Sequence, residues 1–372
     1  RRERSQPAGA TLPLSTHKPV GFLDTLFIST SSVCVTGLTP LDIGTTYTLF
    51  GQTIILLLIQ VGGLGIMSFS FFMILLSGKK MGFQDRVSTL AMYNQEDFQV
   101  LKKVVHTMIF STFIIEFIGA FLLFFSFPKG NFSYQIFTSL FHSISAFCNA
   151  GISTLPQSLE PYYHYFNINF IITTLIIMGG IGFPVLFNLK ERFLSKQKLT
   201  LHTKIVLITS LSLIILGTLA FFLSEKSYAL KEYSTPSKWL ISFFQSVTTR
   251  SAGFNTIDIS QLQTSTYLWL MFLMFVGAAP ASTGGGMRVT NFYILLSMIF
   301  LIFKKQDLNK VYLFKQQVKT EFLIRVGISF FIRIFLVFIG VQILLLYEPF
   351  SFIQILFETV SAFGPVGLST GI

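Results

Sequence analysis

Four short polar turns, each with one central glycine, recur along this chain of 372 residues. Their glycines are Gly37, Gly151, Gly253 and Gly367, spaced 114, 102 and 114 residues apart. Glycine adopts positive φ without a Cβ clash, so a strand through it can turn consecutive carbonyl oxygens toward one axis. In a narrow pore, fixed carbonyl oxygens replace the water that a cation loses on entry. The turns therefore predict a cation site built from backbone oxygen.

The residues around the four glycines define the predicted site. We assign three residues to each turn and number the turns in chain order: Val35, Thr36 and Gly37; Asn149, Ala150 and Gly151; Ser251, Ala252 and Gly253; Pro365, Val366 and Gly367. None of them is a carboxylate, which disfavours a calcium or other divalent site. Pro365 lacks an N–H but keeps its carbonyl. One such turn alone is more often a helix-packing feature, whereas four in register favour a pore.

The composition indicates that membrane helices position these turns. Hydrophobic residues make up 52% of the chain and charged residues only 12%, about half the charged share of soluble domains. Two cysteines exclude a disulfide framework, and five scattered histidines offer no metal-ligand set. We therefore expect no cofactor and no metal beyond a permeating ion. The 27 basic and 16 acidic residues fit the cytoplasmic loops of a membrane protein, so we expect no nucleic-acid partner.

Long apolar runs predict the membrane spans. Each supplies the roughly 20 residues that a spanning helix needs. The runs lie at 46–77, 104–127, 166–189, 204–223, 266–303 and 322–347. Four shorter segments of about 12 residues would reach only ~18 Å as helices, too little to cross the bilayer. These predicted re-entrant helices lie directly before the glycine turns, at 22–33, 135–147, 237–248 and 351–362.

The basic residues predict the orientation of the chain in the membrane. The connections 78–103, 188–204 and 304–325 hold 16 of the 27 lysines and arginines. Basic loops resist translocation, so these connections are expected in the cytoplasm and the four turns toward the outside.

Five acidic residues lie near the predicted site. Asp42, Glu160 and Asp258 follow three of the turns. They either concentrate cations at the outer mouth or are solvated loop residues. Glu116 and Glu358 lie at or near membrane depth, where an ionisable residue is a functional candidate. Glu358 is also placed to brace the fourth re-entrant helix.

The elements repeat in the order helix, re-entrant helix, glycine turn, helix. We therefore predict an all-α membrane protein of four like-oriented pseudo-repeats around a central pore, unlike an inverted-repeat transporter. The predicted repeats are 1–77, 78–194, 195–303 with the gate loop defined below, and 304–372. The first repeat lacks an outer helix and the fourth lacks an inner helix. This pattern suggests a fragment, or a degraded copy, of a longer chain.

A second candidate site interrupts the apolar run 266–303. Three consecutive glycines and a proline should break the helix there. Non-helical backbone at membrane depth is tolerated only inside protein or along a water-filled cavity. We call residues 277–286 the gate loop, and assign to the site Gly277, Ala278, Pro280, Ser282, Thr283, Gly284, Gly285 and Gly286. The alternative is a plain kink, and Arg288 would either anchor the loop or extend toward the cytoplasm.

The four turns and three further segments carry a family resemblance. The segments are "QVGGLGIMSF" (60–69), "MGGIGFPVL" (178–186) and "GAAPASTGGGMRVTN" (277–291). The chain resembles the superfamily of potassium transporters that contains TrkH, KtrB and plant HKT proteins, and most resembles the KtrB-type membrane subunit. The resemblance implies that the four glycines select K⁺, that Na⁺ is tolerated to some extent, and that the gate loop gates the pore. Arg250 matches a family position and would support the filter strand.

The resemblance also implies a biological setting. We expect a multi-pass protein of the bacterial plasma membrane, the cell inner membrane. It would work as a homodimer in the lipid bilayer with a cytosolic nucleotide-binding regulatory ring of the KtrA or TrkA type.

The predicted function is gated potassium uptake through a four-turn carbonyl selectivity filter. Two alternatives keep the same fold: a truncated, non-conducting remnant or assembly subunit, and a sodium-coupled potassium symporter. A membrane enzyme is disfavoured because the sequence shows no paired carboxylates or Cys/His set at membrane depth.

Overall fold

The computed structural model describes residues 14–76, 98–304, 312–313, 316–317 and 320–371. The α-helices in chain order are α1 (Phe22–Val33), α2 (Ile43–Thr46), α3 (Leu49–Leu76), α5 (Phe98–Ser126), α6 (Phe132–Phe147), α7 (Phe166–Gly180), α8 (Phe183–Ser195), α9 (Leu201–Glu225), α10 (Thr235–Thr248), α11 (Thr264–Phe275), α12 (Val289–Phe303), α13 (Thr320–Tyr347) and α14 (Phe352–Phe363). Two short 3₁₀ helices, η1 (Glu160–Tyr162) and η2 (Ile259–Gln261), lie in loops. The predicted all-α membrane fold is confirmed.

Two further observations concern segments between the helices. One short antiparallel pair, β1 (Tyr312–Leu313) with β2 (Gln316–Gln317), was not predicted. Residues 78–97 of the predicted basic connection 78–103 and half of the predicted connection 304–325 lie outside the described residues.

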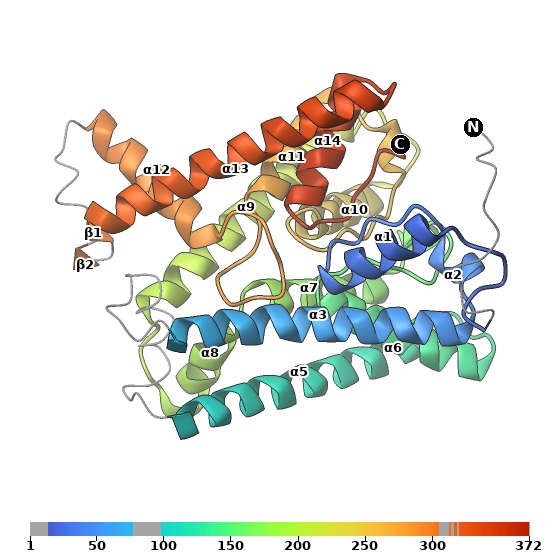
Figure 1. Cartoon of the computed structure of the whole chain (residues 1–372), viewed down its shortest axis with the longest axis horizontal. Coiled ribbons are helices and arrows are strands. Elements are labelled where there is room, and N and C mark those ends of the chain that lie inside the picture. The colour runs from blue at the N-terminus through green and yellow to red at the C-terminus, as the bar shows by residue number, and fades with distance from the viewer. Residues whose placement is uncertain (1–13, 77–97, 305–311, 314–315, 318–319, 372) are drawn as a thin grey trace.

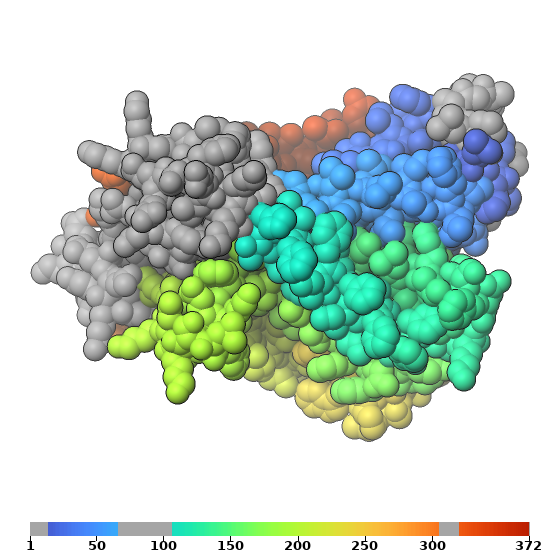
Figure 2. Space-filling model, turned by 90° about the horizontal axis from the view of Figure 1, so that it is seen from below, coloured from blue at the N-terminus to red at the C-terminus, as the bar shows by residue number. Residues whose placement is uncertain are grey.

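Long apolar helices run along the molecule (Figure 1). Among the described residues, α5, α9 and α13 contain apolar segments long enough to cross a membrane, at His106–Ser126, Leu201–Glu225 and Thr320–Tyr347. Helix α3 has 28 residues, a length of about 42 Å. Large apolar side chains cover their outer faces: Phe117 on α5 is 70% exposed and Phe331 on α13 is 72% exposed. Figure 2 shows α3 and α5 side by side on the surface, and such faces suit contact with hydrocarbon.

Four short helices, α1, α6, α10 and α14, gather toward one end of the molecule. They lie in the right half of Figure 1, whereas α8, α12 and the β1–β2 pair lie in the left half. With 12, 16, 14 and 12 residues, none can cross a hydrocarbon core of about 30 Å. The side chains of Asn131 and Ser234 cap two of them by accepting hydrogen bonds from otherwise unpaired N–H groups. At the start of α14, the N–H and the hydroxyl of Ser351 both donate to Oε1 of Gln354. The sequence therefore starts and stops these helices locally.

The predicted span 166–189 is not one straight helix. The segment divides into α7 and α8, which meet at an angle of 103°. Gly182 at the break has a φ of 82°, a left-handed conformation that ends a helix. Pro184 then fits the first turn of α8, because its missing N–H is not needed there. The break turns the chain toward the loop between α11 and α12.

The chain between α11 and α12 is not helical, as its glycines and proline predicted. Residues 276–288 form a loop that closes on itself, with the N–H of Ala278 donating to the carbonyl of Gly285 at 3.0 Å. The N–H of Met287 donates to the carbonyl of Phe275 at the end of α11, also at 3.0 Å. The loop is thus an ordered structure with paired backbone groups, which non-helical backbone at membrane depth requires.

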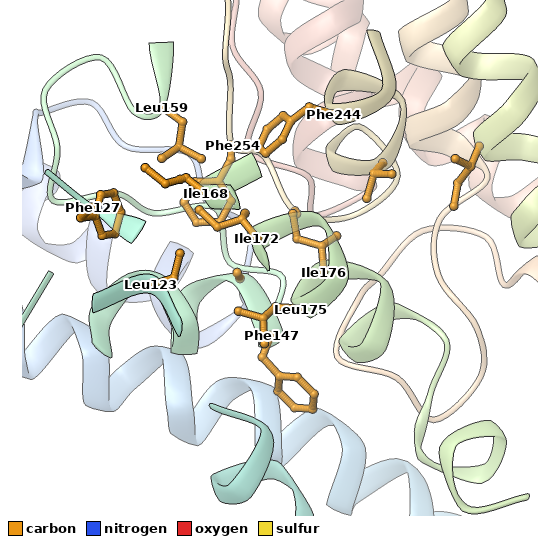
Figure 3. Close-up of a cluster of buried hydrophobic side chains, with 14 of the residues drawn as sticks. Leu123, Phe127, Phe147, Leu159, Ile168, Ile172, Leu175, Ile176, Phe244 and Phe254 are labelled. Carbon is orange, nitrogen blue, oxygen red and sulfur yellow. The ribbon is translucent and has the colours of Figure 1, made fainter. Parts of the chain in front are cut away.

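A buried hydrophobic cluster fixes two of the short helices to their neighbours. Phe147 at the end of α6 and Phe244 on α10 belong to one buried cluster with side chains of α5 and α7 (Figure 3). The labelled partners on α5 and α7 are Leu123, Phe127, Ile168, Ile172, Leu175 and Ile176. Phe254, which directly follows the third turn, is fully buried in the same cluster. The second and third turns are therefore mounted on one common core.

Candidate functional site

Each of the four short helices ends in a glycine turn. All four glycines have positive φ, from 65° at Gly151 to 89° at Gly367. In three turns, the N–H before the glycine donates to a carbonyl five residues earlier: Thr36 at 2.8 Å, Ala150 at 2.8 Å and Val366 at 2.9 Å. The helix end thus positions the strand that follows it.

The four turns lie in a closed ring. An added Cβ on each glycine would collide with the carbonyl oxygen that precedes the next glycine. The colliding pairs are Gly37 with Ala150, Gly151 with Ala252, Gly253 with Val366, and Gly367 with Thr36. The last pair returns from the fourth turn to the first, and the Cβ on Gly367 would lie 2.8 Å from the Cα of Gly37. Each of the four glycines is therefore required for two reasons: its φ is positive, and the neighbouring turn approaches too closely for a Cβ.

The residues two positions before the glycines differ among the turns. Val35 and Asn149 have left-handed φ values of 54° and 59°. A β-branched residue such as Val35 rarely adopts this conformation, so the first turn holds local strain. Pro365 cannot adopt it, because its ring fixes φ near −65°. The ring of carbonyls is thus built from turns that are similar but not identical.

Two side chains on short helices hold the chain beyond a glycine turn. His142 on α6 contacts the carbonyl of Thr138 through Nδ1 at 2.8 Å and the hydroxyl of Ser153 through Nε2 at 2.9 Å. A neutral ring satisfies both contacts if Nδ1–H donates and Nε2 accepts. Glu358 on α14 accepts hydrogen bonds through Oε1 from the N–H of Thr370 at 2.6 Å and from the hydroxyl of Ser369 at 2.9 Å. Glu358 therefore connects α14 to the strand after the fourth turn.

The guanidinium of Arg250 lies behind the third turn. It is buried, and its Nη2 donates to the hydroxyl of Ser210 on α9 and to the carbonyl of Gly277, both at 3.2 Å. The side chain thus connects the third turn to an outer helix and to the first residue of the gate loop. Cys34, Cys148 and Gly364 stand at the same distance before the other three glycines.

Two further arginines hold the gate loop from the opposite side. Arg288 donates through Nη1 to the carbonyls of Gly284 at 2.7 Å and Ala279 at 3.1 Å. Arg333 on α13 donates through Nη1 to the carbonyl of Gly286 at 2.9 Å. Of the two roles considered for Arg288, the anchoring contact is the one present.

The gate loop also binds the break between α7 and α8. The N–H of Ala279 donates to the carbonyl of Gly180 at 2.9 Å, and the N–H of Phe183 donates to the carbonyl of Ala281 at 3.2 Å. A Cβ on Gly182 would lie 2.6 Å from the carbonyl oxygen of Pro280. The absence of a side chain at Gly182 therefore lets the two segments meet.

Three of the four turns contact the gate loop directly. The amide of Asn149 lies 2.8 Å from the hydroxyl of Thr283. An added Cβ on Gly284 would lie 2.8 Å from the Cβ of Ser251. An added Cβ on Gly285 would lie 2.6 Å from the Cδ of Pro365. The loop thus packs against the second, third and fourth turns.

A cavity of about 610 Å³ lies beside the gate loop and the fourth turn. Its lining includes Gly285, Pro365 and three arginines, Arg288, Arg325 and Arg333. Arg325 and Arg333 on α13 and Arg288 at the end of the loop thus bring three positive charges to one pocket.

The three acidic residues beyond the turns have structural partners. Asp42 caps α2 by accepting from the N–H of Thr45 at 2.9 Å, and Asp258 accepts from the N–H of Ser260 at 2.9 Å. Glu160 accepts from the side chain of Asn255 at 2.6 Å. Burial, followed by the nearby charge of Asp258, raises the pKa of Glu160 above its usual range. Burial alone would raise the pKa of Asp258, but its hydrogen bonds from Ser260 and Gln261 lower it.

Glu116 is buried between three helices. Its Oε2 accepts from the amide of Gln60 on α3 at 3.1 Å, and its backbone carbonyl accepts from the hydroxyl of Ser143 on α6 at 2.6 Å. The thiol of Cys148, directly before the second turn, lies 3.8 Å from Oε1. Glu116 therefore links two long helices and the end of a short one.

Sequence reasoning missed several of these contacts. Arg333 could have been found, because an arginine inside an apolar helix is a functional candidate by default. His142 and Ser210 carried no comparable signal, since their partners lie on other elements. Among the described residues, no group of three His, Cys, Asp or Glu side chains is placed to hold a metal ion.

Comparison with known proteins identifies the family. The TrkH family model, described as a cation transport protein, matches residues 5–372. The Ktr system potassium uptake protein B of Bacillus subtilis is 38% identical over 364 residues, which cover 97% of this chain and 81% of that protein. The potassium/sodium uptake protein NtpJ of Enterococcus hirae is 34% identical over 365 residues, which cover 96% and 79%.

A solved structure shares the fold. The potassium transporter TrkH from Vibrio parahaemolyticus matches with a TM-score of 0.71 at 18% sequence identity, over 94% of this chain and 71% of that one. Matches over nearly the whole chain agree at the level of family model, sequence and fold. The chain belongs to the TrkH family of cation transport proteins.

Proposed function

We propose that this chain carries potassium across the cell membrane, with the four turns as its selectivity filter and the gate loop as its gate. The observation that carries the proposal is the closed ring, in which each glycine directs an absent Cβ at a carbonyl oxygen of the next turn. The ring brings together turns from the four predicted repeats, 1–77, 78–194, 195–303 and 304–372. Relatives named as potassium uptake proteins support the choice of ion.

The physical basis is replacement of water by fixed oxygen. Carbonyl groups of the ring compensate the ion for lost hydration. Helices α1, α6, α10 and α14 end at the turns, so their partially negative carboxyl ends add a favourable field for a cation. One glycine per turn gives a short filter, in which some Na⁺ is tolerated. The potassium/sodium uptake protein NtpJ is a relative whose name includes both ions.

The gate loop closes the pore while its anchors hold. Arg250, Arg288 and Arg333 each donate to a loop carbonyl, and the loop packs against three of the four turns. Opening requires the loop to leave these turns. The many separate anchors argue for a defined closed position and against a plain kink.

We further propose that the subunit works as a homodimer with a cytosolic nucleotide-binding ring of the KtrA or TrkA type. Three relatives carry the name of a Ktr system, which implies a further component. The basic connection 188–204, together with the predicted connection 304–325, would receive it. Membership of a family of ion transporters removes the membrane-enzyme alternative.

The proposal is tested by ion influx into liposomes that contain the full chain, with K⁺ and Na⁺ gradients set separately. We expect K⁺-preferring influx. Gly253→Ser should reduce the K⁺/Na⁺ ratio about tenfold, which corresponds to about 1.4 kcal/mol of discrimination. The control is Gly327→Ser on α13, where an added Cβ meets nothing within 4 Å.

The possible results separate the alternatives. Well-folded protein without influx, both in the unmodified chain and when Gly182→Ala displaces the gate loop, would contradict the proposal and favour a non-conducting remnant or assembly subunit. K⁺ influx that requires a Na⁺ gradient would identify a sodium-coupled symporter. An unchanged ratio in Gly253→Ser would remove the third turn from the filter.

A further inference from the structure

The side chain of Asn149 connects the second turn to two other segments. It is fully buried, although its backbone belongs to the proposed filter. In the amide orientation that satisfies both ends, its oxygen accepts from the hydroxyl of Thr283 at 2.8 Å and from the N–H of Gly180 at 3.2 Å. Its nitrogen then donates to the carbonyl of Ile176 at 3.2 Å. One amide therefore contacts the gate loop and the end of α7 together.

Thr283 completes this connection from the side of the gate loop. Its hydroxyl lies 3.1 Å from the carbonyl of Phe147, the last residue of α6, and its N–H donates to the carbonyl of Gly179 at 3.3 Å. When the Asn149 oxygen faces this hydroxyl, the single hydroxyl proton is donated to Asn149. In the opposite amide orientation, the Asn149 nitrogen donates to the hydroxyl and the hydroxyl donates to Phe147. Both acceptors precede the glycine of the second turn by only a few residues. Either choice therefore ties the gate loop to the second turn.

The contact is enclosed. Thr283 is 2% exposed, and a Cβ on Gly179 would lie 3.0 Å from its hydroxyl oxygen. A buried polar group that loses its partner without gaining water is costly. Asn149 also has a left-handed φ of 59°, so the contact holds a residue whose backbone conformation is rarely adopted. Val35 and Pro365, two residues before the first and fourth glycines, have no side-chain group that could make an equivalent hydrogen bond.

We propose that Asn149 and Thr283 form a latch that couples the position of the gate loop to the conformation of the second turn. Asn149 acts here as a positioning residue through its side chain, and the consequence for ions rests on the proposed function. While the latch is closed, Thr283 holds the amide that fixes the left-handed backbone of Asn149. When the gate loop moves away, the amide loses this partner and the following carbonyls gain freedom. Opening the gate therefore alters ion discrimination at the second turn.

The test compares hydroxyl deletions at adjacent positions. Thr283→Val keeps the shape of the side chain and removes the latch hydroxyl. Ser282→Ala removes a hydroxyl that bonds to the carbonyl of Ala279 inside the loop at 2.6 Å. Thr283→Ser restores the latch hydroxyl. For each full-length variant in nanodiscs, amide hydrogen exchange is measured over 147–154 and 277–288, and K⁺/Na⁺ influx ratios are measured in liposomes.

The latch predicts a specific pattern. Thr283→Val should raise exchange in both segments and change the K⁺/Na⁺ ratio about two- to tenfold, the range for loss of one hydrogen bond. Ser282→Ala should affect exchange only within 277–288, and Thr283→Ser should match the unmodified chain. Unchanged exchange at 147–154 in Thr283→Val, or the same pattern in Ser282→Ala, would overturn the latch. Absence of K⁺ influx in both the unmodified chain and Gly182→Ala would refute the proposed function, while the exchange data would still decide the latch.

Discussion

At the scale of single residues, two side chains bind the strand beyond a glycine turn to the short helix before it. His142 does so for the second turn through Ser153, and Glu358 does so for the fourth through Ser369 and Thr370. Such contacts hold the strand that follows the ring. The backbone supplies the proposed ligands, and the side chains supply the rigidity.

Loss of the Glu358 carboxylate should destabilise the fourth turn. Glu358→Ala leaves the Thr370 N–H without this acceptor, and an unsatisfied buried donor costs about 1–3 kcal/mol. Glu358→Gln should cost less, because its amide oxygen still accepts. Thermal unfolding in detergent measures both, with Glu348→Ala, an exposed position just after α13, as the control. Equal unfolding temperatures for all three variants would contradict this role.

Some features of single residues could be predicted from the sequence, and others could not. The four glycines and the re-entrant helices were predictable because φ preference and apolar length are local properties. The contact between Asn149 and Thr283 joins residues 134 positions apart, so no local pattern contains it. The partner of Arg333 is a backbone carbonyl, which leaves no trace in the residue types. The assignment of the turns to a filter remains a prediction, because the ring shows packing and not ion preference.

At the scale of elements, the break between α7 and α8 supports the gate loop. The stretch from Gly179 to Pro184 contains the signals of a break, although the apolar run around it suggested one helix. Because the loop backbone pairs with residues on both sides of the break, we expect a change in the angle of α8 to displace the loop. The basic residues after Asn188 follow on the same helix, so a cytoplasmic partner at that end would have a direct path to the loop.

A side chain at the break should loosen the gate loop. In Gly182→Ala, the new Cβ would meet the carbonyl of Pro280 at 2.6 Å on a residue with φ of 82°. We expect a loss of stability above about 1 kcal/mol and higher K⁺ influx without a regulator, because the loop is displaced from the turns. Liposome influx and thermal unfolding test this. Gly327→Ala, in open space on α13, is the control and should change neither. Lower influx with unchanged stability would argue against the break as the support of the loop.

At the scale of the whole molecule, the glycine turns and the basic connection 188–204 lie toward opposite ends. The short helices and their turns gather toward one end, and α8 and α12 extend toward the other (Figure 1). The basic connection 188–204 follows α8, and the connection between α9 and α10 lies near the short helices. A cation entering from the side of the short helices would meet the ring before the gate loop. During uptake, an ion meets the ring before the gate loop only if the short helices face the outside of the cell.

The orientation can be tested with single cysteines in a Cys34→Ser background, since the other cysteine, Cys148, is buried. Lys231→Cys lies in the exposed connection between α9 and α10, and Lys198→Cys lies in the exposed connection between α8 and α9. Because basic loops are retained in the cytoplasm, a membrane-impermeant thiol reagent added to intact cells should label Lys231→Cys alone. Lys198→Cys should react only after permeabilisation. The reverse pattern would place the gate loop on the outer side of the ring, and an ion entering the cell would then meet the gate before the filter.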